Sequence, residues 1–203
     1  MSISKPADSY RSISSPSTGI YKEFGSKFLS FAFPIITEEG AKSILSNLKS
    51  EYFDARHHCY AYRLGLKGEL WRVNDDGEPS SSAGRPIMGQ ILSNELSDIL
   101  IVVVRYFGGT KLGIPGLIKA YKSASSDAIG NSLIIDKVAS ERITFNFDYI
   151  NMEIVMKLVK STGVDIVSQN FDLRCNISAN VRLSECDTFR KNLSSIEGVD
   201  FEL

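Results

Sequence analysis

One stretch, residues 74–121, constrains the fold of this chain more than any other. It holds seven of the fifteen glycines and is centred on a continuous apolar run, Ile99–Val104, that is typical of a buried strand. An acidic turn, NDDGEP, precedes this run, and a glycine-rich turn with one lysine, GGTKLGIPG, follows it. Glycines and polar groups this dense around a buried strand usually bring backbone close to another group. We therefore look for a functional surface at these two turns.

The composition is that of an ordinary globular protein. Apolar residues make up 43% of the 203 residues and charged residues 23%. The net charge of −1 gives no global electrostatic reason to bind nucleic acid or an anionic membrane, so any basic site must be local. Three cysteines without paired spacing indicate neither a disulfide framework nor a zinc knuckle. With no transmembrane run and no signal-peptide core, we expect a cytoplasmic protein without a membrane partner, metal or cofactor.

The pattern of elements predicts an α+β chain with two domains. Residues 1–18 hold seven serines and two prolines, and we expect them to form a flexible arm. In the first domain, residues 19–135, Thr37 is placed to cap a helix and Gly65–Gly68 to turn a hairpin. Ser80–Ser82 are placed to cap a second helix, over about residues 83–92. A third helix is predicted by an apolar stripe of Leu117, Tyr121, Ala124 and Ala128.

The second domain, residues 136–203, reads as β-α-β-β-α-β, which is the ferredoxin-like order. Apolar residues alternate along residues 142–149, as in a half-buried strand, and Gly163 closes the helix that follows. Residues 1–138 hold 16 basic and 14 acidic residues, a net charge of +2, whereas residues 139–203 hold 7 and 10, a net charge of −3. The second domain therefore has no electrostatic basis for binding phosphates unaided.

The glycine-rich turn permits two interpretations. A loop between a buried strand and a helix exposes backbone N–H groups at the helix N-terminus, where an anion is favoured, and Lys111 and Arg105 would add charge. Alternatively, Gly108 and Gly109 only make a sharp, tightly packed turn. The phosphate-loop pattern fails because Ile114 follows Gly113, and the dinucleotide pattern is absent. We favour anion binding over simple packing, and both over nucleotide hydrolysis.

The acidic turn places three carboxylates, Asp75, Asp76 and Glu78, within four residues. They could hold a divalent cation or act as acid and base, although the spacing is not that of an EF-hand. The alternative is a capping turn, in which carboxylates accept backbone N–H groups and pair with Arg72 or Arg85. Capping is the better interpretation for at least one of the three.

His57 and His58 are the only histidines. Adjacent residues on a strand face opposite ways, so we expect one to be structural and the other to face the motif surface. With Cys59 they form a weak signal for a metal or a nucleophile, whereas Cys175 and Cys186 are expected to be core thiols. Trp71 and Phe107 could stack on bases, but core packing is the commoner fate of such residues.

These motifs resemble the Impact family, including the bacterial YigZ proteins. The resemblance covers about residues 20–130. It rests on ordered, correctly spaced blocks: ARHHCYAYR at 55–63, DDGEP at 75–79, AGRP at 83–86, VVRYFGGTKLG at 103–113, Gly116-Leu117 and Ala120-Tyr121. Two positions depart from the family pattern. Ser80–Ser82 stand where a Ser-Gly-Thr-like sequence is usual, and Pro115, which lacks an N–H, stands where glycine is more common.

The resemblance implies that the first domain is an α/β two-layer sandwich like the second domain of a small-subunit ribosomal protein. It implies that the second domain is like the ferredoxin-like domains of elongation factor G. Eukaryotic members of the family resemble regulators of translation that bind a partner of the kinase sensing amino-acid starvation, and bacterial members have no established reaction. Likeness of fold alone is a weak warrant for function.

Two functional hypotheses follow. The first is a non-enzymatic, translation-linked binding protein whose motif surface contacts RNA, the ribosome or a protein partner. The second is an enzyme that acts on a phosphate-bearing small molecule with His57 or His58 and the carboxylates of the acidic turn. The sequence leaves the oligomeric state open. The motif surface comprises His57, His58, Asp75, Asp76, Glu78, Arg85, Arg105, Gly108, Gly109 and Lys111.

Overall fold

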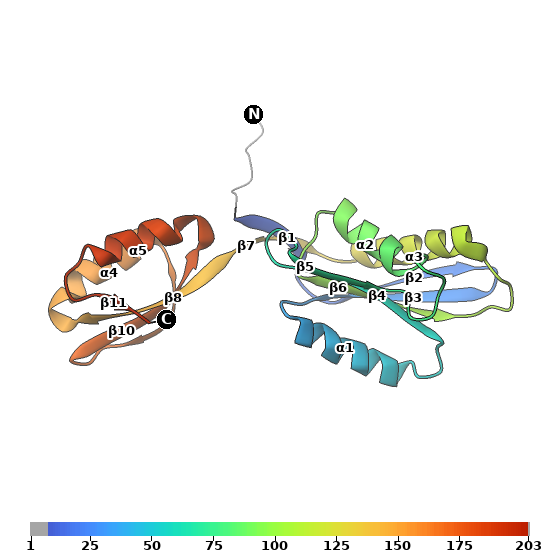
Figure 1. The fold of residues 1–203 in the computed structure, drawn as a ribbon, viewed down its shortest axis with the longest axis horizontal. Coiled ribbons are helices and arrows are strands. Elements are labelled where there is room, and N and C mark those ends of the chain that lie inside the picture. The colour runs from blue at the N-terminus through green and yellow to red at the C-terminus, as the bar shows by residue number, and fades with distance from the viewer. Residues whose placement is uncertain (1–7, 203) are drawn as a thin grey trace, which may run out of the picture. The chain divides into compact units, whose positions relative to one another are not determined.

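The structure is a computed structural model that describes residues 8–202 (Figure 1). The chain divides into two compact units. The first is Tyr10–Lys137, and the second combines Val138 onward with Asp8 and Ser9. Strands and helices occur in both units, which confirms the predicted α+β class. No helix among the described residues is both long enough and apolar enough to cross a membrane.

The first unit is built on a five-stranded antiparallel sheet with the order β2-β3-β6-β4-β5. The strands are β2 (Ser17–Glu23), β3 (Ser26–Pro34), β4 (His57–Leu64), β5 (Leu70–Asn74) and β6 (Ile99–Tyr106). β6 is the central strand, and its residues 99–104 are fully buried. Its side chains alternate between two hydrophobic cores, one on each face of the sheet. This double burial explains the continuous apolar run in the sequence.

Three helices cover the two faces of this sheet. α2 (Gly84–Ser93) and α3 (Gly113–Gly130) lie on one face, and α1 (Glu38–Glu51) lies on the other (Figure 1). Thr37 caps α1 as predicted, because its hydroxyl accepts the N–H of Gly40 at 3.1 Å. The predicted apolar stripe of α3 is buried against the sheet. The mixed α/β sandwich is therefore confirmed, with α1 forming a further layer on the second face.

The expected flexible arm is wrong over its described part. Residues 1–7 lie outside the described residues, but Ser9–Ile13 form a strand, β1, which pairs with β7 (Ile134–Val138). Ile13 is almost wholly buried in the first unit's core, and the hydroxyl of Tyr10 donates to Asp98 at 2.5 Å. The burial of one isoleucine and the pairing with β7 hold this serine-rich segment in place. Neither feature can be predicted from the composition of the segment.

The second unit confirms the β-α-β-β-α-β order. Its sheet has the order β11-β8-β10-β9, and its two helices pack on the sheet around a single core. Gly163 ends the first helix in the left-handed conformation, with φ 62°, as predicted. Cys175 and Cys186 are buried, which confirms them as core thiols. The elements are β8 (Ser140–Asp148), η1 (Tyr149–Asn151), α4 (Met152–Thr162), β9 (Asp165–Asn170), β10 (Arg174–Arg182), η2 (Leu183–Glu185), α5 (Cys186–Ser194) and β11 (Asp200–Phe201).

Candidate functional site

Two antiparallel pairings gather the sequence motifs at one end of the first unit's sheet. His57 begins β4 and pairs with Arg105 near the end of β6. β5 runs antiparallel to β4 and ends at Asn74, two positions before Asp76. The acidic turn and the glycine-rich turn therefore leave the sheet at the same end, beside the histidines.

Asp75 is the cap of helix α2. Its carboxylate accepts the backbone N–H groups of Ser81, Ala83 and Gly84 at 2.8–2.9 Å. The expectation that Ser80–Ser82 cap this helix is wrong, since none of these hydroxyls bonds a free N–H group of α2. A carboxylate is the stronger acceptor, and its charge also favours the helix N-terminus.

Asp76 fastens the start of β4. It adopts the left-handed conformation, with φ 41°, and its carboxylate accepts the backbone N–H of His58 at 2.7 Å and the Nζ of Lys49 at 3.3 Å. Its carbonyl lies 2.8 Å from His57 Nδ1. Because a carbonyl can only accept, this contact places a proton on Nδ1 of His57 and leaves Nε2 as the acceptor of the neutral ring.

Glu78 is the centre of a buried polar network. One carboxylate oxygen lies 2.7 Å from Arg105 Nη1 and 2.7 Å from the hydroxyl of Tyr121. The side chains of Glu78 and Arg105 are only 3% and 8% exposed. The Arg105 guanidinium also lies 5.4 Å from the ring of Phe28 and 5.8 Å from that of Phe107. The expected pairing of the acidic turn with Arg72 or Arg85 is wrong, and Arg105 takes that place.

The buried network excludes Cys59 as a nucleophile. Its Sγ lies 3.0 Å from the carbonyl of Asp75 and 3.3 Å from the Tyr121 hydroxyl, and its side chain is fully buried. Burial raises the pKa of the Cys59 thiol and that of the Tyr121 phenol far above their ordinary values. Both groups are therefore protonated at neutral pH, and a protonated, inaccessible thiol does not attack a substrate.

The two histidines have different environments, as predicted. His58 is 5% exposed, and its Nε2 is buried without a hydrogen-bond partner. Burial lowers the pKa of His58, against the opposing effect of Asp76, so the ring is neutral at pH 7. His57 instead lines an open pocket on the motif surface.

This pocket has a volume of about 370 Å³ and lies between the acidic turn and the start of α3. Its lining contains three cations, Arg56, Arg105 and Lys111, and one carboxylate, Glu78, which Arg105 already pairs. The ring of Phe107, which is 54% exposed, stands in its wall, so the core packing expected for Phe107 is wrong. The remaining lining residues are His57, Pro79, Leu112, Gly113, Ile114 and Leu117. The pocket is therefore cationic, with an apolar wall.

The glycine-rich turn packs tightly at Gly108 and leads into the uncapped start of α3 at Gly113. A Cβ on Gly108 would lie 1.9 Å from the carbonyl carbon of Gly25, so Gly108 is required by close packing of two backbones. Gly113 starts α3, whose N-cap residue offers no side-chain acceptor. The first N–H groups of α3 are thus open to an external acceptor, and Pro115 removes only one of them.

Several predicted site residues do not face this pocket. His58, Asp75 and Asp76 shape the turn, and Arg85 lines a separate groove with Trp71. The sequence analysis did not identify Arg56 as a lining residue, although Arg56 directly precedes His57. It also did not identify Tyr121 as a partner of Glu78, because the position of Tyr121 in the apolar stripe of α3 predicts only core packing. No group of three or more His, Cys, Asp or Glu residues between 8 and 202 could hold a metal ion.

Comparisons with known proteins agree with this architecture. The family model described as the Impact N-terminal domain matches residues 24–129. An IMPACT family member from Haemophilus influenzae is 31% identical over 173 residues, which cover 83% of each chain, and YigZ of Escherichia coli is 31% identical over 66% of each. A solved structure of a hypothetical protein is 25% identical, covers 96% of each chain and superposes with a TM-score of 0.72.

Proposed function

Because the chain belongs to the Impact family, we propose that it is a translation-linked binding protein that holds RNA in the pocket beside His57. The link to translation comes from the likeness of eukaryotic family members to regulators of translation. The observation that carries the RNA assignment is the charge of the pocket. All three carboxylates of the acidic turn are engaged by the protein itself, which leaves Arg56 and Lys111 free to face an anion.

The pocket offers the groups that a phosphate needs. Lys111 and Arg56 have no hydrogen-bond or ion-pair partner among residues 8–202. The open N-terminus of α3 lies at the same wall, where backbone N–H groups and the helix dipole both favour a negative charge. Glu78 does not repel the phosphate, because Arg105 neutralises it at 2.7 Å.

Phe107 supplies the contact that separates a nucleotide from a bare phosphate. Its ring is exposed beside the cations, and Arg105 approaches it at 5.8 Å. Exposed aromatic rings next to cationic grooves stack on unpaired bases, whatever the base. We therefore assign the pocket to single-stranded RNA, with one phosphate at Lys111 and an adjacent base on Phe107.

The enzyme hypothesis has less support. It required carboxylates to work with His57 or His58, but Asp75 caps a helix, Asp76 fastens β4 and Glu78 is paired in a buried network. His58 is buried. Of the two histidines only His57 lines the pocket, and an isolated histidine lacks the second acid or base that such catalysis ordinarily uses.

The test is the salt dependence of binding of a fluorescent single-stranded oligouridylate. Each phosphate contact to a single strand contributes about 0.7 to the slope of log affinity against log salt. Lys111→Ala should lower the magnitude of the slope by about 0.7. Lys122→Ala, which changes an exposed lysine of α3 outside the pocket, should leave the slope unchanged. Phe107→Ala should weaken binding by about 1–3 kcal/mol at every salt concentration without changing the slope.

Absence of binding at 20 mM salt would overturn the RNA assignment. So would equal slopes for Lys111→Ala and Lys122→Ala, since binding would then be spread over the surface. Competition with uridine monophosphate provides a further arm. If the mononucleotide displaces the oligonucleotide at an equal molar concentration, the site serves a small phosphate-bearing molecule instead.

A further inference from the structure

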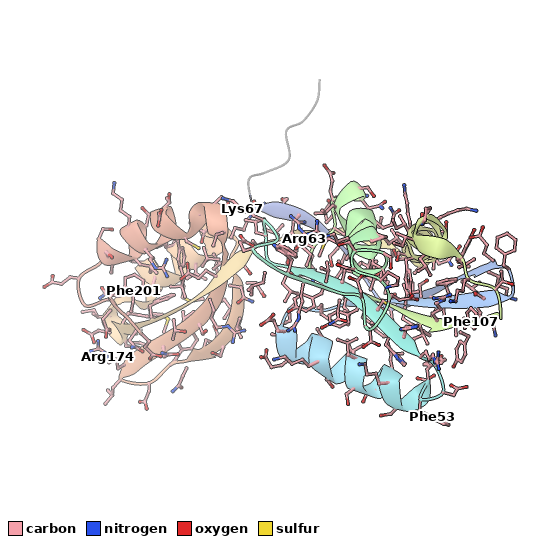
Figure 2. All side chains as sticks on the ribbon, turned by 45° about the vertical axis from the view of Figure 1, so that its right-hand side comes forward. Phe53, Arg63, Lys67, Phe107, Arg174 and Phe201 are labelled. Atoms are coloured by element: carbon pink, nitrogen blue, oxygen red, sulfur yellow. The ribbon has the colours of Figure 1, made fainter. Side chains whose placement is uncertain are left out.

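A second groove runs along the β5 edge of the first unit's sheet and shares no lining residue with the first pocket. Its volume is about 600 Å³, and β5 and the outer face of α2 form its walls. β4 runs from His57 at the first pocket to Leu64, so Arg63 and the following turn with Lys67 lie at the far end. Figure 2 shows Arg63 and Lys67 there, and Phe107 at the other end of the same sheet. The groove is thus separate from the pocket assigned to RNA.

One wall of the groove is the edge of the sheet. β5 pairs with β4 on one side and, on the other, with no strand of residues 8–202. Trp71 and Val73, which alternate along β5, both face the groove, and Trp71 is 62% exposed. The expectation that Trp71 packs in the core is therefore wrong. Alternate N–H and C=O groups of an unpaired edge strand point outward and can pair with another extended chain.

The groove combines an apolar floor with positive charge. Met88 and Leu92 of α2 complete the floor with Val73. Arg63, Lys67 and Arg85 surround it, and none of the lining residues is acidic. Hydrogen bonds to the carbonyls of Leu96 and Lys67 hold the Arg63 guanidinium. The Lys67 ammonium and the Arg85 guanidinium have no ion-pair partner in the described part of the chain.

We propose that this groove binds an extended acidic segment of a partner protein, which adds to β5 as a sixth strand. The main-chain edge of β5 would pair with about five residues of the segment. Apolar side chains on one face of the segment fill the floor, and neighbouring Asp or Glu side chains meet Arg63, Lys67 and Arg85. Charge complementarity selects this occupant, because a second copy of the chain would bring three more cations to the same edge.

The unpaired main-chain edge of β5, beside an aliphatic floor, favours a peptide over RNA at this site. Val73, Met88 and Leu92 form this floor, and Trp71 stands beside it. Bases stack on aromatic rings, whereas apolar side chains of a β-strand fill aliphatic pockets at every second residue. The free edge of β5 has no role in binding RNA.

The first experiment selects from a random dodecapeptide library displayed on phage, with the full chain immobilised. Selected peptides should be rich in Asp and Glu alternating with apolar residues. The dissociation constant of a synthetic selected peptide should rise at least about tenfold with Lys67→Glu/Arg85→Glu. The matched control, Lys42→Glu/Lys122→Glu, changes the same charge on exposed residues outside the groove and should leave affinity within twofold.

A second experiment tests strand addition without altering the protein. Two peptides are compared, one N-methylated at the odd-numbered nitrogens and the other at the even-numbered nitrogens. Only one of these two sets of N–H groups points towards β5, so methylation of that set should abolish binding and methylation of the other set should not. Selection of peptides without acidic enrichment, equal affinity for the charge-reversed and control variants, or indifference to both methylation patterns would each overturn the proposal. Displacement of the peptide by oligouridylate, with loss of both ligands in Lys67→Glu/Arg85→Glu, would assign the groove to RNA instead.

Discussion

Glu78 and Arg105 form an ion pair that is almost wholly removed from water, between the acidic turn and the central strand. Transferring two charged groups from water into the protein interior costs more free energy than their mutual attraction provides, unless other groups complete their hydrogen bonds. Tyr121 supplies such a partner to Glu78, while Arg105 Nε is left without one. The pair therefore fixes the position of the turn against β6 more than it adds stability.

Breaking this pair should be costly, whereas replacing it should not. Glu78→Gln leaves the Arg105 charge buried without its counter-charge, and we expect the free energy of unfolding of the first unit to fall by about 3–5 kcal/mol. The double change Glu78→Gln/Arg105→Met removes both charges and should cost clearly less than the sum of the single changes. Urea titration followed by circular dichroism measures both. Additive costs would show that the two charges do not depend on each other.

At the scale of elements, α2 is stabilised by a residue outside its own sequence. Asp75 lies nine positions before Gly84 and still accepts three N–H groups at the N-terminal end of α2. The acidic turn can do this because Gly77, with φ 87°, and Asp76, with φ 41°, adopt left-handed conformations that fold the turn back on itself.

Replacing the capping residue should show whether Asp75, as in the structure, or the serines at 80–82, as the sequence suggests, cap α2. Asp75→Ala should lower the free energy of unfolding by about 1–2 kcal/mol, since the N–H groups of α2 lose their acceptor. Ser80→Ala, at a residue that the sequence alone nominates as a cap, should change it by less than about 0.5 kcal/mol. Thermal unfolding of the two variants compares them directly. A larger effect at Ser80 than at Asp75 would contradict the assignment.

The sequence predicts the elements of this site better than its contacts. The period of the apolar residues predicts the central strand and α3, and adjacency on a strand predicts that His57 and His58 face opposite ways. The partner of Glu78 could not be predicted, because the pairing of β4 with β6 decides which arginine reaches the turn. Nearby arginines, Arg72 and Arg85, are the natural choices when register is unknown.

At the scale of the whole molecule, the second unit is discontinuous in sequence. Asp8 is 2% exposed and accepts hydrogen bonds from Arg182 and Ser184, and its carbonyl accepts the N–H of Ala139. The hydrogen bond from Ser184, followed by that from Arg182, lowers the pKa of Asp8 from 3.8 to about 2. The composition of residues 1–18 conceals this role, because one buried carboxylate among serines produces no periodic pattern.

The lowered pKa makes a pH-dependent contribution to stability. Below pH 3.8 the unfolded chain takes up a proton at Asp8 while the folded chain resists it until about pH 2. The contribution is therefore complete above pH 3.8 and is lost as pH falls through about 2. Asp8→Asn should lower the urea midpoint of the second unit at pH 6, and this difference should shrink towards zero as the pH falls to 2.

The matched control is Ser184→Ala, which removes the hydroxyl that binds Asp8 at 2.7 Å but keeps the carboxylate. It should raise the pKa of Asp8 in the folded state, so that the pH-dependent contribution to stability is smaller at pH 6 and its loss ends at a higher pH than in the wild type. A constant difference between Asp8→Asn and wild type from pH 6 to pH 2 would show that Asp8 does not titrate with folding.

The placement of Asp8 also orders events during synthesis. Asp8 leaves the ribosome before any residue of Tyr10–Lys137, but its partner Arg182 lies 174 positions later. The first unit can fold as soon as its own residues have emerged. The second unit can fold only after its last strands have emerged, and Asp8, which was synthesised before the first unit, must then bind to them. The earliest-made described residue is therefore among the last to reach its native contacts.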